Sequence, residues 1–126
     1  MYTGLGIKCQ VLDSTRQENS INSTPSPAYA FVRAALLERR CVSADYLGFT
    51  RLMCPHVIGL KQGKERALFF QFAGGSRSGL PPGGEWRCLD LSGLSKISIY
   101  AGRWRQGPSK TRPQSCVDQI DVQVEA

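Results

Sequence analysis

The sequence predicts a small, mainly β protein with one N-terminal helix, built as an SH3-like or Sm-like barrel of about five antiparallel strands. Three observations support this class. The chain has 126 residues, the length of one ordinary domain. Only one segment has helical periodicity, and the segment after it consists of short apolar runs separated by turns. An OB-like barrel is the alternative, although that fold usually has a helix where this chain has a glycine-rich loop.

The predicted helix begins at Ser26 and ends at Arg40. Ser26 is a typical N-cap residue, and Pro27 suits the first helical turn. Apolar residues recur at helical spacing at Ala28, Phe31, Val32, Ala35 and Leu36. Residues 1–24 are polar and lack a sustained period, so we expect a flexible tail with at most a marginal strand at Ile7–Leu12.

Strand-like segments begin at Cys41, and we predict them at 41–46, 49–60, 66–72, 85–91 and 96–100. The segment RALFFQF, residues 66–72, alternates most clearly and is expected to lie inside the sheet. Pro55 cannot donate to a strand ladder and therefore predicts an edge or a bulge. The helix and these strands define one folded domain over 25–102. Residues 103–126 are expected to be a basic tail followed by a possible short terminal strand.

The composition narrows the function classes. Sixteen Lys and Arg against ten Asp and Glu give a net charge of +6, and the basic surplus is concentrated in residues 61–112. Such a surface attracts nucleic acid or an anionic ligand, although many basic faces are only solvated. No apolar run is long enough to span a membrane, and the first residues lack a signal-peptide pattern, so we expect a cytoplasmic protein that does not enter membranes.

The five cysteines are scattered and form no CxxC pair or Cys/His cluster. We therefore expect no zinc site and no cofactor, and we expect reduced thiols. Cys41, Cys54 and Cys88 lie in apolar stretches, where cysteine usually behaves as a small buried hydrophobic residue.

Three segments carry a family resemblance: PHVIG at 55–59, RALFFQF at 66–72, and WRCLDLSGLSKISI at 86–99. Their order resembles that of the WYL domain, a small SH3-like barrel found mainly in bacterial regulators of phage-defence and stress genes. Ala67-Leu68-Phe69 stands in place of the Trp-Tyr-Leu triad, and Arg87 matches an arginine of the family's binding site. The resemblance implies a ligand-binding regulatory module. The helix-turn-helix domain that usually precedes a WYL domain needs more than the single helix predicted here.

Arg87 is the leading candidate for a binding residue. On an extended strand it shares a face with Leu89 and Leu91, and an arginine on an apolar face needs an anionic partner or must reach the rim. That partner is either a ligand or a carboxylate of the chain. The loop Gly74–Gly84 can surround an anion with backbone N–H groups, or it can be a simple connection. The candidate anion- or ligand-binding residues are Arg87, Ser76, Arg77, Ser78, Gln71 and His56.

His56 is the only histidine, and on an uninterrupted strand it lies on the side of apolar residues, which favours a structural, hydrogen-bonded role over a binding role. The chain has no GxSxG motif, so we expect a protein that is not an enzyme. A second candidate surface mixes aromatic and basic residues in the manner of proteins that stack bases and hold phosphates. Its candidate nucleic-acid contacts are Arg103, Trp104, Arg105, Lys110 and Arg112.

These observations predict a non-catalytic binding or regulatory module that recognises an anionic small molecule or single-stranded nucleic acid. The alternative is a protein-interaction module or structural adaptor, in which the basic surface meets an acidic partner and a sheet edge accepts a strand.

Overall fold

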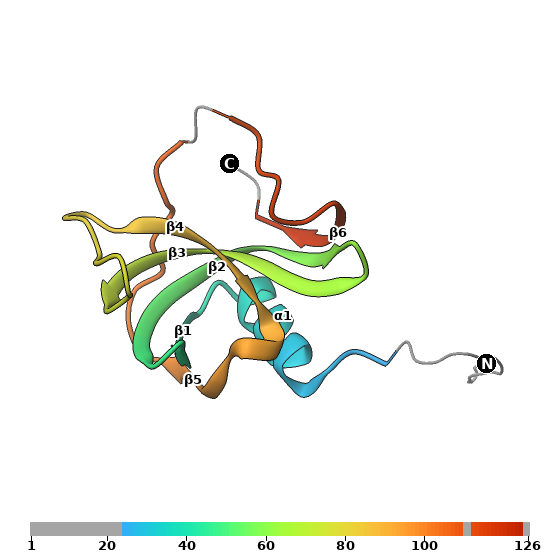
Figure 1. Cartoon of the computed structure of the whole chain (residues 1–126), viewed down its shortest axis with the longest axis horizontal. Coiled ribbons are helices and arrows are strands. Elements are labelled where there is room, and N and C mark those ends of the chain that lie inside the picture. Colours follow the sequence, from blue (N-terminus) through green and yellow to red (C-terminus); the bar gives the residue numbers. More distant parts are fainter. Residues whose placement is uncertain (1–23, 110–111, 125–126) are drawn as a thin grey trace, which may run out of the picture.

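A computed structural model describes residues 24–109 and 112–124 of the chain (Figure 1). It contains one α-helix and an open antiparallel sheet of six strands. In chain order the elements are α1 (Pro27–Leu37), β1 (Cys41–Tyr46), β2 (Phe49–Lys61), β3 (Lys64–Gly74), β4 (Glu85–Asp90), the 3-10 helix η2 (Leu91–Gly93), β5 (Ser95–Tyr100) and β6 (Gln119–Gln123).

The mainly β class with one helix is confirmed, and the closed barrel is not. Five strands follow the order β4-β3-β2-β1-β5, and β6 pairs with β2 outside this order. The sheet stays open because the two end strands, β4 and β5, do not pair with each other in the described part of the chain. The predicted tail, with its marginal strand at Ile7–Leu12, lies outside the described residues except for Thr24.

β2 organises the sheet because it is long enough to serve three neighbours. It pairs with β1 from Phe49 to Met53, with β6 from Val57 to Leu60, and with β3 on its other side. The register between β2 and β3 shifts twice, and one shift lies directly after Pro55, where a bulge is one of the predicted outcomes. Bulges bend a strand and increase its twist, so the sheet curves around its contents.

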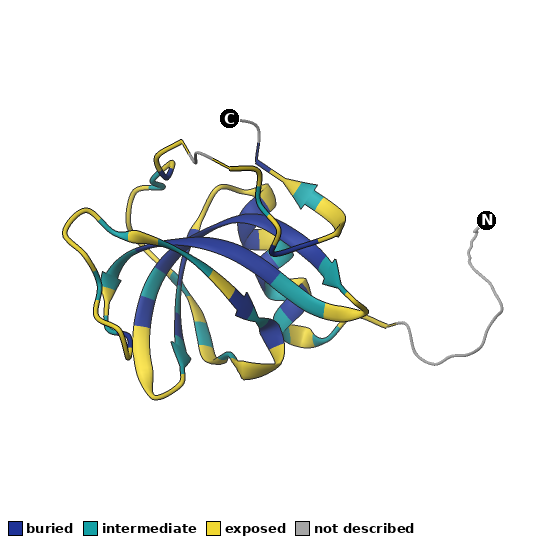
Figure 2. Cartoon of the chain, turned by 45° about the horizontal axis from the view of Figure 1, so that its top comes forward, coloured by how far each residue is buried: buried dark blue, intermediate teal, exposed yellow. Residues whose placement is uncertain are grey.

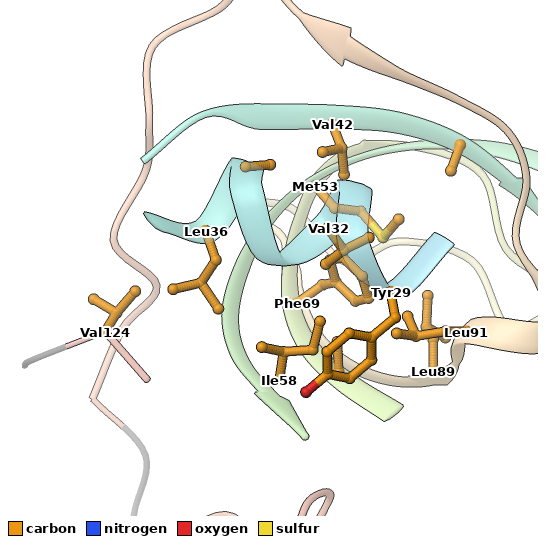
Figure 3. Close-up of a cluster of buried hydrophobic side chains, with 13 residues drawn as sticks. Tyr29, Val32, Leu36, Val42, Met53, Ile58, Phe69, Leu89, Leu91 and Val124 are labelled. Atoms are coloured by element: carbon orange, nitrogen blue, oxygen red, sulfur yellow. The ribbon is translucent and has the colours of Figure 1, made fainter. Parts of the chain in front are cut away.

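The main core lies between α1 and the sheet (Figure 3). Val32 and Leu36 of the helix pack against residues of the central strands, including Met53, Ile58 and Phe69, and all five are fully buried. Burying one side chain of this size contributes roughly 1.5–3 kcal/mol, so this cluster supplies most of the stability. We call this side of the sheet the helix face. Figure 2 shows the buried residues running along the middle of the sheet, with the turns exposed.

Both ends of α1 have a local cause. The Ser26 hydroxyl accepts a hydrogen bond from the Tyr29 N–H at 3.1 Å and donates one to Glu65 at the start of β3. The predicted N-cap is therefore confirmed, and it also joins the helix to the sheet. The helix ends at Leu37, before the predicted Arg40, because Arg39 adopts a left-handed conformation with φ 55°.

A smaller cluster covers the other side of the sheet, which we call the opposite face. Val57, Leu68 and Trp86 of the sheet meet Cys116 and Val117 of the segment that leads to β6. Trp104, Cys116 and Val117 are thus packed against the sheet, whereas the sequence predicts a basic tail from residue 103. The possible terminal strand is observed as β6.

The prediction of reduced thiols is wrong for Cys88 and Cys116, which form a disulfide with a Cα–Cα distance of 5.6 Å. Cys88 is also exposed, whereas we predicted a buried residue. The pairing is not visible in the spacing because the fold brings the residues together across a sequence separation of 28. Disulfides persist mainly in oxidising compartments, so this bond gives no support to the expected cytoplasmic location. Cys41 and Cys54 are free and buried, as predicted.

Among the described residues, the structure has no helix of sufficient length and apolarity to span a membrane.

Candidate anion-binding site

A polar layer lies next to the core on the helix face, at one end of three neighbouring strands. Strand side chains alternate between faces, so the residues two positions from core residues share their face. Met53, Phe69 and Leu89 belong to the core. Two positions away on the same strands stand Arg51 of β2, Gln71 of β3 and Arg87 of β4.

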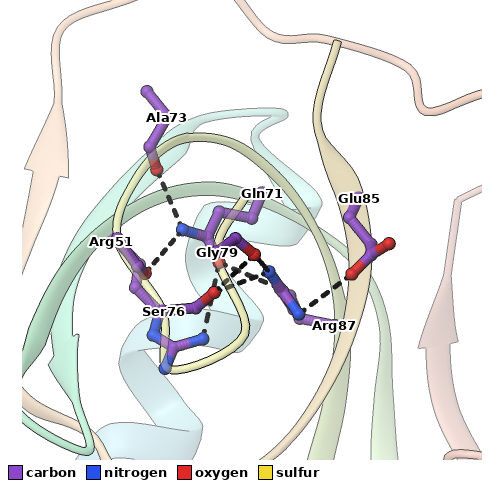
Figure 4. Close-up of polar contacts among 8 residues, drawn as sticks. Arg51, Gln71, Ala73, Ser76, Gly79, Glu85 and Arg87 are labelled. Atoms are coloured by element: carbon purple, nitrogen blue, oxygen red, sulfur yellow. Dashed lines mark hydrogen bonds and ion pairs between the residues drawn. The ribbon is translucent and has the colours of Figure 1, made fainter. Parts of the chain in front are cut away.

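Arg87 is held by the chain on nearly all sides (Figure 4). Its Nε donates to Gln71 Oε1 at 3.2 Å, and its Nη2 donates to Ser76 Oγ and to the Gly79 carbonyl, each at 2.9 Å. Its Nη1 forms an ion pair with Glu85 at 3.0 Å, and 13% of its side chain is exposed. Arg87 therefore fixes the loop after β3 against β4 and keeps only part of its donor capacity for another group.

The loop of residues 75–84 is anchored to this layer at several points. Ser76 is buried, and its hydroxyl donates to the Gly79 carbonyl at 2.7 Å. The Gln71 amide donates to the Gly75 carbonyl at 3.0 Å. At the return of the loop, Gly84 has φ 96°, and a Cβ there would lie 2.6 Å from the Gln71 carbonyl oxygen. Only glycine fits that position, so the sequence itself specifies how the loop rejoins the sheet.

Arg51 is the least satisfied charged residue of the layer. It is 4% exposed, and its Nη2 donates to the Tyr46 carbonyl at 3.2 Å. Its Nη1 reaches Gln71 Oε1 at 3.5 Å, and its guanidinium lies 5.2 Å from the centre of the Tyr46 ring. Within the described residues its Nε has no hydrogen-bond partner, and no carboxylate lies within ion-pair distance. Burial, followed by the positive charge of Arg87, lowers the pKa of Arg51.

A cavity of about 390 Å³ opens on this layer. Its lining includes Arg51, Arg87, Ser76, Arg77, Ser78, Tyr46 and Leu47. Arg77 and Ser78 are exposed on the loop, so their donors are accessible from solvent. We call this space the arginine cavity. It combines buried and exposed guanidinium groups, and no Asp or Glu among the described residues lines it.

The structure thus brings together five of the six predicted binding residues. Arg87, Ser76, Arg77 and Ser78 line the arginine cavity. Gln71 is fully buried beneath it and accepts hydrogen bonds from Arg51 and Arg87 through one oxygen, so it positions both guanidinium groups.

His56 lies elsewhere, on the opposite face. Its Nδ1 is 2.9 Å from the Cys54 carbonyl, and its Nε2 accepts the Gly107 N–H at 3.3 Å. This pattern requires a proton on Nδ1 and a lone pair on Nε2, which is a neutral imidazole. Its ring stacks on Trp104 and meets the edge of Trp86, each at 4.8 Å between ring centres. These contacts place His56 outside the arginine cavity, in the hydrogen-bonded setting that the sequence favours for it.

The predicted nucleic-acid contacts do not form one surface. Trp104 stacks on His56 and packs against the main core. The Arg105 guanidinium covers the Phe72 ring at 3.9 Å, while Arg103 is exposed. Arg112 lines cavities on the opposite face beside Leu68 and Trp86. Lys110 lies outside the described residues.

Arg51 is the functional candidate that the sequence analysis missed, although a signal was present. In the segment FTRLM, residues 49–53, Arg51 alternates in step with Phe49 and Met53. The argument used for Arg87, an arginine in step with apolar residues on one strand, applies equally to Arg51.

Comparisons with protein-family models, with curated proteins and with solved structures gave no match to this chain.

Proposed function

We propose that this protein is a non-catalytic binding module that takes an anion in the arginine cavity. The observation that carries the proposal is the burial of Arg51 beside a second arginine, without a carboxylate partner among the described residues. An unpaired buried charge is costly, and a second positive charge nearby increases the cost. An anion in the cavity relieves both costs, because it attracts both guanidinium groups.

The chemistry of the lining supports the same class of ligand. Guanidinium groups bind carboxylates and phosphates through paired N–H donors, and such charge-assisted hydrogen bonds are stronger than neutral ones. Arg87 and Gln71 hold the loop in place before any ligand arrives. A preformed site loses little entropy when its ligand binds.

A binding role is favoured over catalysis because, among the described residues, the lining of the arginine cavity has no histidine, carboxylate or free thiol that could activate the hydroxyl groups of Ser76 and Ser78. The only histidine is on the opposite face with both ring nitrogens hydrogen-bonded, and Cys88, which lines the cavity, is in a disulfide. Single-stranded nucleic acid is less favoured because Trp104 and Arg105 are engaged with other side chains.

The resemblance to the WYL domain agrees with this proposal, since it relates Arg87 to that family's binding arginine. We propose accordingly that the sheet is an SH3-like barrel left open between β4 and β5, and that the arginine cavity is its ligand site.

Titration followed by amide NMR tests the proposal. Phosphate, sulfate and acetate are each added to the wild type, to Arg51→Met and to Arg40→Met. The last variant is a matched control that removes an equal charge from an exposed arginine beside Glu38. We expect saturable shifts in residues 75–84 of the wild type and of the control. The Arg51 variant should bind at least about tenfold more weakly, the cost of one lost charge-assisted hydrogen bond.

Two results contradict the proposal. One is the absence of saturable shifts with all three anions in the wild type. The other is unchanged affinity in the folded Arg51→Met protein, which would make Arg51 a structural residue.

A further inference from the structure

The charge around the arginine cavity indicates the charge of its ligand. Arg51, Arg77 and Arg87 bring three positive charges, and Glu85, the ion-pair partner of Arg87, brings one negative charge. Two positive charges therefore remain without an ion-pair partner in the described part of the chain. A ligand with two negative charges balances them, whereas a singly charged carboxylate or sulfate ester leaves one arginine uncompensated.

The directions of the donors point to a tetrahedral anion. Arg51 approaches from β2, Arg87 from β4, and Arg77 and Ser78 from the loop between β3 and β4. A planar carboxylate is satisfied by the fork of one guanidinium, so a second arginine on another strand adds little to its binding. A phosphate group presents three oxygens in different directions and can use donors from several elements.

The rim of the cavity carries a second signal, at the turn between β1 and β2. Leu47 lines the cavity, is 72% exposed and has φ 52°. A left-handed backbone is unfavourable for leucine, and exposing its side chain to water adds a further cost. The two-residue turn Leu47-Gly48 accounts for this φ, as the turn Gln62-Gly63 does for Gln62, so the exposed leucine at the cavity is the feature that points to an apolar group on the ligand. The neighbouring Tyr46 ring, which lies against Arg51, extends this apolar side of the lining.

We propose that the ligand of the arginine cavity is a phosphate monoester in its dianionic form, with an apolar or aromatic organic group that packs against Leu47 and Tyr46. This inference rests on the proposed anion-binding function and adds the ligand class. The phosphate occupies the space between Arg51, Arg87 and the loop, and the organic group covers the exposed leucine.

Calorimetric titration of the full chain with three matched probes tests the class. Phenyl phosphate, phenyl sulfate and benzoate share one ring and differ in the anion. At about pH 7.5 phenyl phosphate is mainly a dianion, since the second pKa of a phosphate monoester is about 6. We expect it to bind about tenfold or more tightly than either of the others, because one more charged contact is made.

Lowering the pH separates the charge of the ligand from its shape. Between about pH 7.5 and about pH 5 the dianion fraction of phenyl phosphate falls about tenfold, and its affinity should fall in proportion. Phenyl sulfate keeps one charge over this range. The titratable groups that line the cavity among the described residues are Arg51, Arg77, Arg87 and Tyr46, and Glu85 lies beside it as the ion-pair partner of Arg87. Phenyl sulfate meets all of them, so it corrects for any change in the protein.

Leu47→Asn tests the apolar rim. Asparagine tolerates the left-handed conformation, so the fold should be kept. We expect phenyl phosphate to bind about fivefold more weakly, the effect of losing roughly one partly buried side chain, and inorganic phosphate to bind unchanged. Ile120→Asn, which alters another exposed apolar residue on β6, is the control and should change neither.

The outcomes distinguish this inference from the function on which it rests. If no probe binds, the anion-binding function itself is wrong. If benzoate or phenyl sulfate binds as tightly as phenyl phosphate, the function stands and the phosphate class is wrong. An unchanged affinity of Leu47→Asn for phenyl phosphate overturns the apolar rim. A phosphotyrosine peptide that binds more tightly than phenyl phosphate indicates a protein-borne phosphate, and weaker binding indicates a free metabolite; both support the class.

Discussion

Replacing Arg51 by methionine should make the ligand-free protein more stable, although the same change weakens anion binding. Arginine 51 is 4% exposed and has no carboxylate partner among the described residues. Methionine keeps much of the volume and removes the buried charge. The opposite signs of the two effects separate a functional residue from a structural one.

The magnitude follows from the contacts that are lost and the cost that is relieved. The variant loses one hydrogen bond to the Tyr46 carbonyl at 3.2 Å and a long one to Gln71 at 3.5 Å, and Gln71 keeps Arg87 as a donor. A charged hydrogen bond contributes about 1.5–3 kcal/mol. Desolvation of an uncompensated buried ion costs several kcal/mol, so we expect a net gain of about 1 kcal/mol.

Thermal unfolding measures this difference. A gain of about 1 kcal/mol raises Tm by roughly 4–8 °C in a domain of this size. Arg66→Met is the matched control on the same sheet, because Arg66 has a carboxylate partner, Asp90, at 2.7 Å. That variant should lose up to about 1 kcal/mol, the usual range for a partly exposed ion pair.

Ligand linkage supplies the second half of the test. A bound anion at ten times its Kd adds about 1.4 kcal/mol to the unfolding free energy of the wild type. The Arg51 variant binds at least about tenfold more weakly, so the same anion concentration should raise its unfolding free energy by at most about 0.4 kcal/mol. A ligand-free variant that is less stable than the wild type by about 2 kcal/mol or more refutes the reasoning, because Arg51 is then a net contributor to the fold.

Further predictions concern the cysteines and the junction of α1 with β6. Removing the Cys88–Cys116 disulfide, by reduction or by a double Cys→Ala variant, should lower the unfolding free energy by about 3–4 kcal/mol, because the bond closes a loop with a sequence separation of 28 in the unfolded chain. Denaturant titrations measure this loss, and equal stability of the reduced and oxidised proteins contradicts the prediction. Burial, above all, raises the pKa of the Cys54 thiol to about 12. Iodoacetamide should therefore label Cys54 only after unfolding, as mass spectrometry will show, and rapid labelling of the native protein argues against this packing. Hydrogen bonds from Tyr29 and Arg33 lower the pKa of Asp121, so the stability this carboxylate provides should be present at neutral pH and lost as pH falls below its ordinary value of about 4. The difference in Tm between the wild type and Asp121→Asn should shrink in acid, and a constant difference excludes this linkage.

Local signals predicted most of the strand positions. β1 has the predicted bounds because the turn at Leu47-Gly48 follows it directly. The alternation in RALFFQF correctly predicted the interior strand β3, and the helix began where Ser26 provides a cap. These elements depend on neighbours in sequence, so turn residues, caps and the two-residue period are sufficient to find them.

Features that depend on distant contacts were not predictable in the same way. The pairing of β6 with β2 and the Cys88–Cys116 disulfide both require residues 113–123 to return to the sheet. The open edge between β4 and β5 depends on the curvature that the bulges impose on β2, which strand counting does not provide. The sequence analysis missed Arg51 for a similar reason. Arg51 becomes buried only when the loop after β3 is held over it.

The arrangement of the polar layer links stability and binding in one structure. The alternation that places Met53, Phe69 and Leu89 in the core places Arg51, Gln71 and Arg87 beside them, on strands that bulges and pairing hold at fixed spacing. Arg87 donates hydrogen bonds to Ser76 and Gly79 of the loop. Among the described residues, the Arg51 guanidinium interacts only with the Tyr46 carbonyl, the Gln71 amide oxygen and the Tyr46 ring. A cation placed directly on an apolar core is tolerated because the remaining core is large enough to compensate for it. It follows that an anion in the arginine cavity should slow hydrogen exchange first at this end of the sheet, at the amides of residues 75–84 and of the neighbouring ends of β2, β3 and β4.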